Sequence, residues 1–317
     1  MTQAEDTALR SALHLLEQEA PEAVRNPAGL TPPTRRDAAL RDLKAVLHDL
    51  PASVAQSPAK PVLRTLHHLA CTGGTLLSKA IAAQPNVALL SEVDPFSPLN
   101  YTRDTHFRPT DMIGLAKMGS RAASRDTQVR LFQASIEVLA QDNHAQGIHM
   151  VLREHSHGKY THDAGIGDYP GLRTLLDGFD LLSVVTVRDP IDSYLALQAH
   201  GWISITPAGF DEYCRRMLVF LDDHAGLPVI RYEDFVTDPD TQCRALCDAL
   251  ALPYNPDFAD LIGALRISGD SGRRGTEMHL RPRRTIPDDL RPEFQDSPHH
   301  AAVAQRLGYS TDLTAPE

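Results

Sequence analysis

The sequence predicts an α/β fold with a central parallel sheet, and three observations support this prediction. Residues 62–79 combine a short apolar run, a glycine turn and the start of a helix. Two later runs, 147–152 and 181–187, are apolar and lead into charged residues. The run 87–90 is short and continuously apolar, which is typical of a strand buried on both faces. Runs of this kind, alternating with helical stretches, favour parallel strands joined by helices.

The size and charge of the chain limit its class. At 317 residues it can bury one large core with a small appendage. The net charge of −10 and the pI of about 5.8 disfavour a general binder of nucleic acid or anionic membranes. No apolar run approaches the roughly 18 residues of a membrane span, and residues 1–11 are acidic where a secretory leader needs positive charge. We therefore expect a cytoplasmic protein with no nucleic-acid partner and no membrane span.

The cysteine pattern agrees with a reducing compartment. No two cysteines form a C-x-x-C pair, and Cys243 and Cys247 share one face of an expected helix. With Cys71 and Cys214, they are expected to be thiols rather than disulfides or zinc ligands.

Residues 1–60 are expected to form a helical extension that precedes a main domain at 61–317. Apolar residues recur at helical spacing within 8–19 and 38–50, and a proline-rich link lies at 26–33. Packing on the core and mediating a homodimer are equally open roles for this extension.

The first strand ends in a turn that is typical of an anion site. Backbone N–H groups in such a turn point inward, and the following helix adds about half a positive charge at its N-terminus. The turn differs from an ATP-binding loop because no lysine stands beside Gly74, and Lys79 lies about one turn into the helix. A nucleotide with a single 5′-phosphate group fits this turn, and glycines that merely let strand and helix pack are the alternative. The candidate binding residues are Cys71, Thr72, Gly73, Gly74, Thr75 and Leu76.

Charged residues follow the next two strands, at the edge where ligands of parallel sheets lie. Glu92 and Asp94 follow the run 87–90. Two carboxylates bind a phosphate poorly, so a role as a base is the more useful interpretation, and capping of the next segment is equally open. Arg153 follows the run 147–152 and is the candidate anion-binding cation.

His155, His157 and His162 raise the question of a metal site. An H-x-H pair on a loop is common, and no carboxylate at a firm spacing completes a ligand set. We therefore expect no metal.

The run 181–187 leads directly into Arg188-Asp189-Pro190-Ile191-Asp192-Ser193. Arg188 is suited to bidentate binding of a phosphate at the end of this strand. Pro190 fits the first turn of a helix, where its missing N–H costs nothing. A last strand at 227–232 and a helix at 239–250 follow.

Two other stretches are expected to reach the site. The stretch 96–125 should be a long loop leading into a helix, and its Arg103, His106 and Arg108 would meet either substrate or solvent. The stretch 266–291 is rich in arginine within an acidic chain, so it suits a second phosphate, with a solvated tail as the alternative. Its candidate binding residues are Ser271, Gly272, Arg273 and Arg274.

Together these segments resemble the sulfotransferases that use 3′-phosphoadenosine 5′-phosphosulfate (PAPS). Residues 71–77 are similar to that family's [RK]-S-G-T-T-[LW]-L motif, and 188–193 to its R-[DN]-P-x-[DS] motif. Residues 229–235 are similar to its late V-R-Y-E-D-L segment, and 268–274 to the glycine-and-arginine loop that closes over the cofactor. The resemblance spans residues 62 to about 290 and implies a three-layer P-loop NTPase-like fold.

The resemblance also implies roles for particular residues. The first motif would hold the 5′-phosphosulfate, and Arg188 and Ser193 the 3′-phosphate. By similarity to tyrosylprotein sulfotransferases, Glu92 would be the catalytic base and Arg153 the cation that assists the leaving group. His155 is the rival base, and no metal is required.

Two positions depart from the family pattern. Cys71 stands where the family has arginine or lysine, and Ala196 where many members have a second phosphate-binding serine. Arg153, or an arginine of the segment 273–284, would have to supply the missing charge. The leading hypothesis is an enzyme that sulfates a hydroxyl of a small molecule, lipid or carbohydrate. A degenerate relative that binds an adenosine phosphate as a sensor or assembly partner is the alternative, and a P-loop kinase is disfavoured by the missing lysine.

Overall fold

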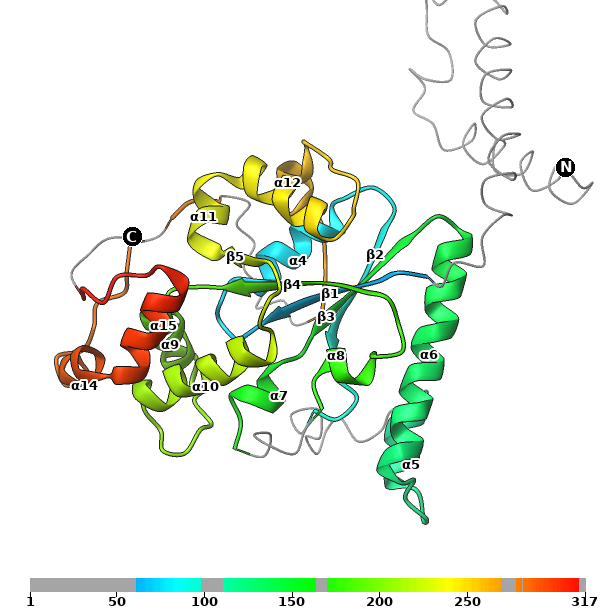
Figure 1. Cartoon of the computed structure of the whole chain (residues 1–317), viewed down its shortest axis with the longest axis horizontal. Coiled ribbons are helices and arrows are strands. Elements are labelled where there is room, and N and C mark those ends of the chain that lie inside the picture. The colour runs from blue at the N-terminus through cyan, green and yellow to red at the C-terminus, as the bar shows by residue number, and fades with distance from the viewer. Residues whose placement is uncertain (1–60, 98–110, 164–169, 269–277, 281, 314–317) are drawn as a thin grey trace, which may run out of the picture. The chain divides into compact units, whose positions relative to one another are not determined.

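A computed structural model describes residues 61–97, 111–163, 170–268, 278–280 and 282–313. Within them, five strands form one parallel sheet in the order β2-β3-β1-β4-β5 (Figure 1). The predicted α/β fold with a central parallel sheet is therefore confirmed. The strands are β1 (Leu63–His68), β2 (Val87–Val93), β3 (His149–Glu154), β4 (Leu181–Val187) and β5 (Val229–Arg231).

Helices cover both faces of this sheet and make three layers (Figure 1). One face carries α4 (Gly74–Ala82), α11 (Tyr232–Thr237), α12 (Pro239–Ala249) and α13 (Phe258–Leu261). The opposite face carries α6 (Arg125–Ala145), α8 (Leu172–Leu175), α9 (Pro190–His200), α10 (Phe210–Asp223) and α15 (Pro298–Leu307). The remaining described helices are α5 (Met112–Met118), α7 (His157–Tyr160) and α14 (Arg291–Asp296).

Strand β1 lies at the centre because its side chains alternate between two apolar cores. Leu66 is fully buried against α4 and α12, whereas Leu63 is fully buried on the side of α6 and α8. Burying a leucine completely contributes about 1.5–3 kcal/mol, so a strand buried on both faces is held firmly in place. From β1 the chain passes over β3 to β2, returns to β3, and then crosses β1 to reach β4. The order of the strands thus changes direction beside β1, and ligands of open α/β sheets bind beyond such a switch point.

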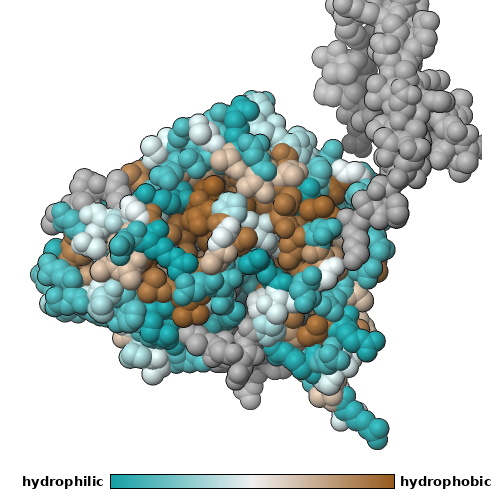
Figure 2. Space-filling view, viewed as in Figure 1, coloured by the Kyte–Doolittle hydropathy of each residue, from teal (hydrophilic) through white to brown (hydrophobic). Residues whose placement is uncertain are grey.

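The prediction that β2 is buried on both faces is wrong. β2 is an edge strand of the described sheet, none of its residues is fully buried, and Leu90 is 38% exposed. An apolar run alone does not distinguish an edge from a centre, because both need residues with high strand propensity. Figure 2 shows apolar side chains gathered in the middle of the viewed face, over the sheet and α4, with hydrophilic residues around them.

The cysteines and the helix after the long loop agree with the predictions from the sequence. The four cysteines are free thiols, and Cys214, Cys243 and Cys247 are buried, as predicted. A helix, α5, follows the loop as expected, and the Asp111 side chain caps it by accepting from the Gly114 N–H at 3.1 Å. No helix of the described residues is long and apolar enough to cross a membrane. Residues 1–60, 98–110 and 269–277 lie outside the described residues, so the N-terminal extension remains a prediction.

Candidate functional site

The turn between β1 and α4 requires glycine at two consecutive positions. Gly73 adopts φ 85°, and a Cβ there would stand 2.3 Å from the ring of Tyr232. A Cβ on Gly74 would stand 2.4 Å from three atoms of the His68 ring. Among the described residues, no side chain caps the N-terminus of α4 through a hydrogen bond. The turn therefore presents backbone donors at a helix N-terminus, which is the physical basis of an anion site.

The hydroxyls of this turn have separate partners. Thr72 is buried and donates to the carbonyl oxygen of Leu69 at 2.7 Å, so its hydroxyl shapes the turn. The Thr75 hydroxyl accepts from Arg153 Nη2 at 3.4 Å. Cys71 adopts φ 63°, a left-handed conformation that is uncommon outside glycine.

Arg153, at the end of β3, connects the turn to the neighbouring strands. Its side chain is buried, and its Nη1 lies 2.9 Å from Glu92 Oε1. Nη1 also donates to Ser91 Oγ at 3.0 Å, and Nε donates to His68 Nε2 at 2.7 Å. The guanidinium thus joins side chains from β1, β2 and α4 at one edge of the sheet. It brings together the sequence-predicted residues Glu92, Arg153 and Thr75.

His68 was not singled out from the sequence, yet it fixes the orientation of Arg153. Its Nδ1 lies 2.8 Å from the Leu69 carbonyl oxygen and must donate to it, so Nε2 accepts from Arg153. Burial, with a further effect of the Arg153 charge, lowers the pKa of His68 to about 3. The imidazole is therefore neutral at physiological pH and acts as an acceptor for the guanidinium. A histidine inside an apolar strand gives no sequence signal for this role.

Glu92 is the carboxylate of the site. Burial raises its pKa, and the Arg153 charge opposes that rise. Glu92 adopts φ 63° at a bulge of β2, where the register with β3 shifts. This local departure from strand geometry accompanies the contact with Arg153, and strained residues are often found at functional sites.

His155 lies beside Glu92, with its Nε2 3.4 Å from Glu92 Oε2. Its Nδ1 lies 3.0 Å from Ser97 Oγ, and burial, then the Arg153 charge, lowers its pKa to about 4. The ligand atoms of Glu92, His155 and His157 all lie within 4.8 Å of one another. Glu92 thus reaches the H-x-H pair from another strand, a carboxylate that spacing in the sequence does not reveal, and the expectation of no metal stays a prediction.

The segment after β4 forms a second polar region beside the turn. Arg188 Nη1 donates to the Cys71 carbonyl oxygen at 3.4 Å, and its guanidinium lies 4.9 Å from the centre of the Tyr232 ring. Its buried Nε has no hydrogen-bond partner among the described residues. Ser193 is fully buried in α9. Burial raises the pKa of Tyr213, and its neighbours Cys71, Ser193 and Arg188 have smaller effects.

The arginine-rich C-terminal stretch reaches this region through Arg283. Its Nη2 lies 2.7 Å from Asp189 Oδ2, and its Nε lies 3.8 Å from Asp192 Oδ2. Arg283 is therefore paired with buried carboxylates, and the structure gives it no contact with Glu92 or Arg153 that would let it replace the missing cation. Ser271, Gly272, Arg273 and Arg274 lie outside the described residues, so their role as a cofactor loop stays a prediction.

The chain matches a known protein family and several solved structures. The sulfotransferase family model matches residues 69–256, more than half of the chain. No curated protein matches the sequence. The solved structures that match include the sulfotransferase domain of the Synechococcus PCC 7002 olefin synthase, at 17% identity and a TM-score of 0.47. That match covers 80% of this chain and 97% of that one.

Two other solved structures also match this chain. The sulfotransferase domain of the curacin biosynthetic pathway is 16% identical, with a TM-score of 0.45, and the match covers 79% of this chain and 98% of that one. A mouse sulfotransferase complexed with PAP is 10% identical, with a TM-score of 0.37, covering 81% of this chain and 86% of that one. The family match covers the glycine turn, Glu92, Arg153 and Arg188. The chain therefore belongs to the sulfotransferase family.

Proposed function

We propose that this protein transfers the sulfuryl group of PAPS to an acceptor hydroxyl, with Glu92 as the base. The observation that carries the proposal is the position of Arg153, which contacts Glu92 on one side and Thr75 of the glycine turn on the other. A base and a cation are thus held together at the carboxyl end of a parallel sheet, beside a helix N-terminus. This is the arrangement that transfer of an anionic group requires.

The cofactor would occupy the two polar regions described above. The backbone N–H groups of Gly73, Gly74 and Thr75 would hold the 5′-phosphosulfate at the N-terminus of α4. The 3′-phosphate would meet Arg188, whose buried Nε lacks a partner among the described residues. A half-buried guanidinium whose buried Nε lacks a partner in the described part of the chain is suited to a phosphate oxygen. Ser193 and the segment 271–274 would complete this end.

Sulfuryl transfer would proceed by in-line displacement, as phosphoryl transfer does. The acceptor oxygen forms a bond to sulfur, while the bond between sulfur and the bridging oxygen of the 5′-phosphate breaks. Glu92 takes the hydroxyl proton, and the departing phosphate oxygen keeps the electron pair. Arg153 and the N–H groups of the turn stabilise the charge that grows on that oxygen. Arg153 therefore provides the cation that Cys71 does not.

The acceptor would be a small molecule, a lipid or a carbohydrate with a free hydroxyl. The residues described above would contact the donor and the transferred proton, so they would admit an acceptor of any of these classes.

Titration calorimetry with adenosine 3′,5′-bisphosphate (PAP) tests the donor site. Arg188→Ala should weaken binding by about 2 kcal/mol or more, since it removes charge-assisted hydrogen bonds. Arg244→Ala is the matched control, because that arginine is 55% exposed on α12. Failure of the wild-type protein to bind PAP would overturn the proposal. Binding of PAP without transfer of labelled sulfuryl groups to a panel of phenols, sugars and alcohols would instead favour the sensor hypothesis.

A further inference from the structure

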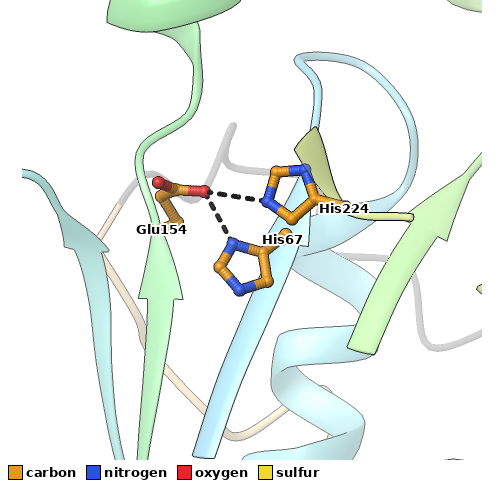
Figure 3. A group of neighbouring side chains, drawn as sticks. All are labelled: His67, Glu154 and His224. Carbon is orange, nitrogen blue, oxygen red and sulfur yellow. Dashed lines mark hydrogen bonds and ion pairs between the residues drawn. The ribbon is translucent and has the colours of Figure 1, made fainter. Parts of the chain in front are cut away.

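A second cluster of polar side chains lies buried beneath the site. It comprises His67 of β1, Glu154 at the end of β3 and His224 at the end of α10 (Figure 3). Their side chains are 0%, 6% and 5% exposed. His67 Nδ1 lies 2.6 Å from Glu154 Oε2, and His224 Nε2 lies 3.8 Å from the same oxygen. The proposed sulfuryl transfer uses none of the three.

The outer hydrogen bonds of the two imidazoles fix which nitrogen carries the proton of each ring in its neutral form. His224 Nδ1 lies 2.7 Å from the Phe220 carbonyl oxygen, which can only accept, so the proton of a neutral ring stands on Nδ1. His67 Nε2 lies 2.8 Å from Thr65 Oγ1, and that hydroxyl donates its own proton to Ser183 at 2.7 Å. His67 Nε2 must therefore donate to Thr65. Both neutral rings then turn a lone pair toward Glu154.

With both rings in the neutral form, three lone pairs converge, from His67 Nδ1, Glu154 Oε2 and His224 Nε2. The ligand atoms all lie within 4.8 Å of one another. Among the described residues, the Ser156 hydroxyl at 3.2 Å and the Leu172 N–H at 2.6 Å also contact the carboxylate, and neither carries a charge. His67 Nδ1 and Glu154 Oε2 are hydrogen-bonded at 2.6 Å, so a cation must lie between them, either a proton or a metal ion.

We propose that this cluster binds one zinc ion. Two histidines and a carboxylate are a common zinc ligand set, and a water molecule would complete four-fold coordination. Each ligand also has the outer partner that metal ligands need. His224 donates to a backbone carbonyl, His67 donates to a hydroxyl, and the second oxygen of Glu154 accepts a backbone N–H.

The geometry also predicts a small movement on binding. Tetrahedral ligands about 2.0 Å from zinc stand about 3.3 Å apart. His67 Nδ1 and Glu154 Oε2, now 2.6 Å apart, would separate, and His224 would approach. The ion would thereby link β1, β3 and α10 next to Arg153 and His68.

Metal analysis of the purified full-length protein tests the proposal. After dialysis against buffered micromolar zinc, about one equivalent should remain bound to the wild type. His224→Gln should reduce this to below about 0.1 equivalent. His155→Ala is the matched control, because it removes a histidine from the other His-His-Glu group, and it should retain the zinc. Cobalt substitution should give visible absorption bands of a four-coordinate site in the wild type and the control.

Two outcomes would overturn the proposal. A wild type that binds no zinc under these conditions would mean that the cation is a proton shared with Glu154. Loss of zinc from His155→Ala together with retention in His224→Gln would place the metal at Glu92 instead. If His224→Gln fails to fold, the wild type still decides the matter, since chelation should lower its melting temperature and added zinc should restore it.

Discussion

Glu233 accepts the backbone N–H of Asp189 through its Oε1 at 2.9 Å, which ties the start of α11 to the turn that carries Arg188. Its Oε2 accepts the Tyr309 hydroxyl at 2.9 Å, so both carboxylate oxygens are used. Burial raises the pKa of Glu233. The late segment that resembles the V-R-Y-E-D-L motif therefore supports the proposed 3′-phosphate region.

Glu233→Ala should lower both stability and nucleotide affinity. It leaves two buried donors without an acceptor, and each such donor costs about 1–3 kcal/mol. Urea unfolding and calorimetry with PAP measure the two effects. Tyr309→Phe is the control, because it removes one hydrogen bond and keeps the one to Asp189, so PAP affinity should hold. Unchanged PAP affinity in Glu233→Ala would refute the supporting role.

Gly74→Ala should disrupt the site through His68. The new Cβ would stand 2.4 Å from the imidazole, which must move and release Arg153. We expect a loss of about 1–3 kcal/mol in stability, as for an overpacked core position, and a loss of PAP binding. Gly178→Ala is the control, since a Cβ there meets nothing within 4 Å.

A double-mutant cycle distinguishes this steric effect from a general loss of helix structure. His68→Ala removes the ring that the new Cβ would strike. The stability cost of Gly74→Ala should therefore be smaller in the His68→Ala background than in the wild type. Simple additivity of the two costs would show that the clash is relieved in another way.

Arg283→Met should destabilise the protein strongly. Asp189 is fully buried, and removing its partner leaves an unpaired charge at a cost of about 3–5 kcal/mol. Arg291→Met provides the comparison, because its partner Asp288 is 99% exposed and such ion pairs contribute at most about 1 kcal/mol. Equal midpoints of urea unfolding for the two variants would mean that Arg283 is dispensable.

The regular elements were predictable because their signals are local. The β-branched run 181–187 coincides with β4, and the helix expected at 239–250 is α12, Pro239–Ala249. Asp238 caps α12 and Pro239 starts it, which are short-range signals. Helix α10 was missed, although its buried residues Phe210, Tyr213, Met217 and Phe220 recur at helical spacing.

The site was only partly predictable because it depends on contacts between distant residues. The apolar runs that precede Glu92 and Arg153 predicted that both residues lie at strand ends. Because β2 and β3 pair in parallel, these ends lie side by side in the sheet. It gave no sign of His68 as the partner of Arg153, since a histidine in an apolar strand has many possible roles. It also missed Arg283 as the partner of Asp189, 94 residues earlier in the chain.

Glu92→Gln should reduce turnover by about 100- to 10,000-fold, the usual contribution of a general base. Its affinity for PAP should stay close to that of the wild type, because the amide still fits beside Arg153. The pH profile of the wild type gives a second test. A base acts only when deprotonated, and burial raises the pKa of Glu92 above 4.5. Activity should therefore fall as the pH drops through that raised value and level off above it.

Comparing His155→Ala with Glu92→Gln distinguishes the two candidate bases, Glu92 and His155. The fall in activity at low pH does not identify the base, because both residues would cause one. Burial lowers the pKa of His155 to about 4, so this residue is also deprotonated at neutral pH. If Glu92 is the base, His155→Ala keeps most of the activity, and that activity still falls at low pH. Glu92→Gln then loses both the activity and its dependence on low pH. A variant Glu92→Gln that still turns over, together with an inactive His155→Ala, would assign the proton transfer to the histidine.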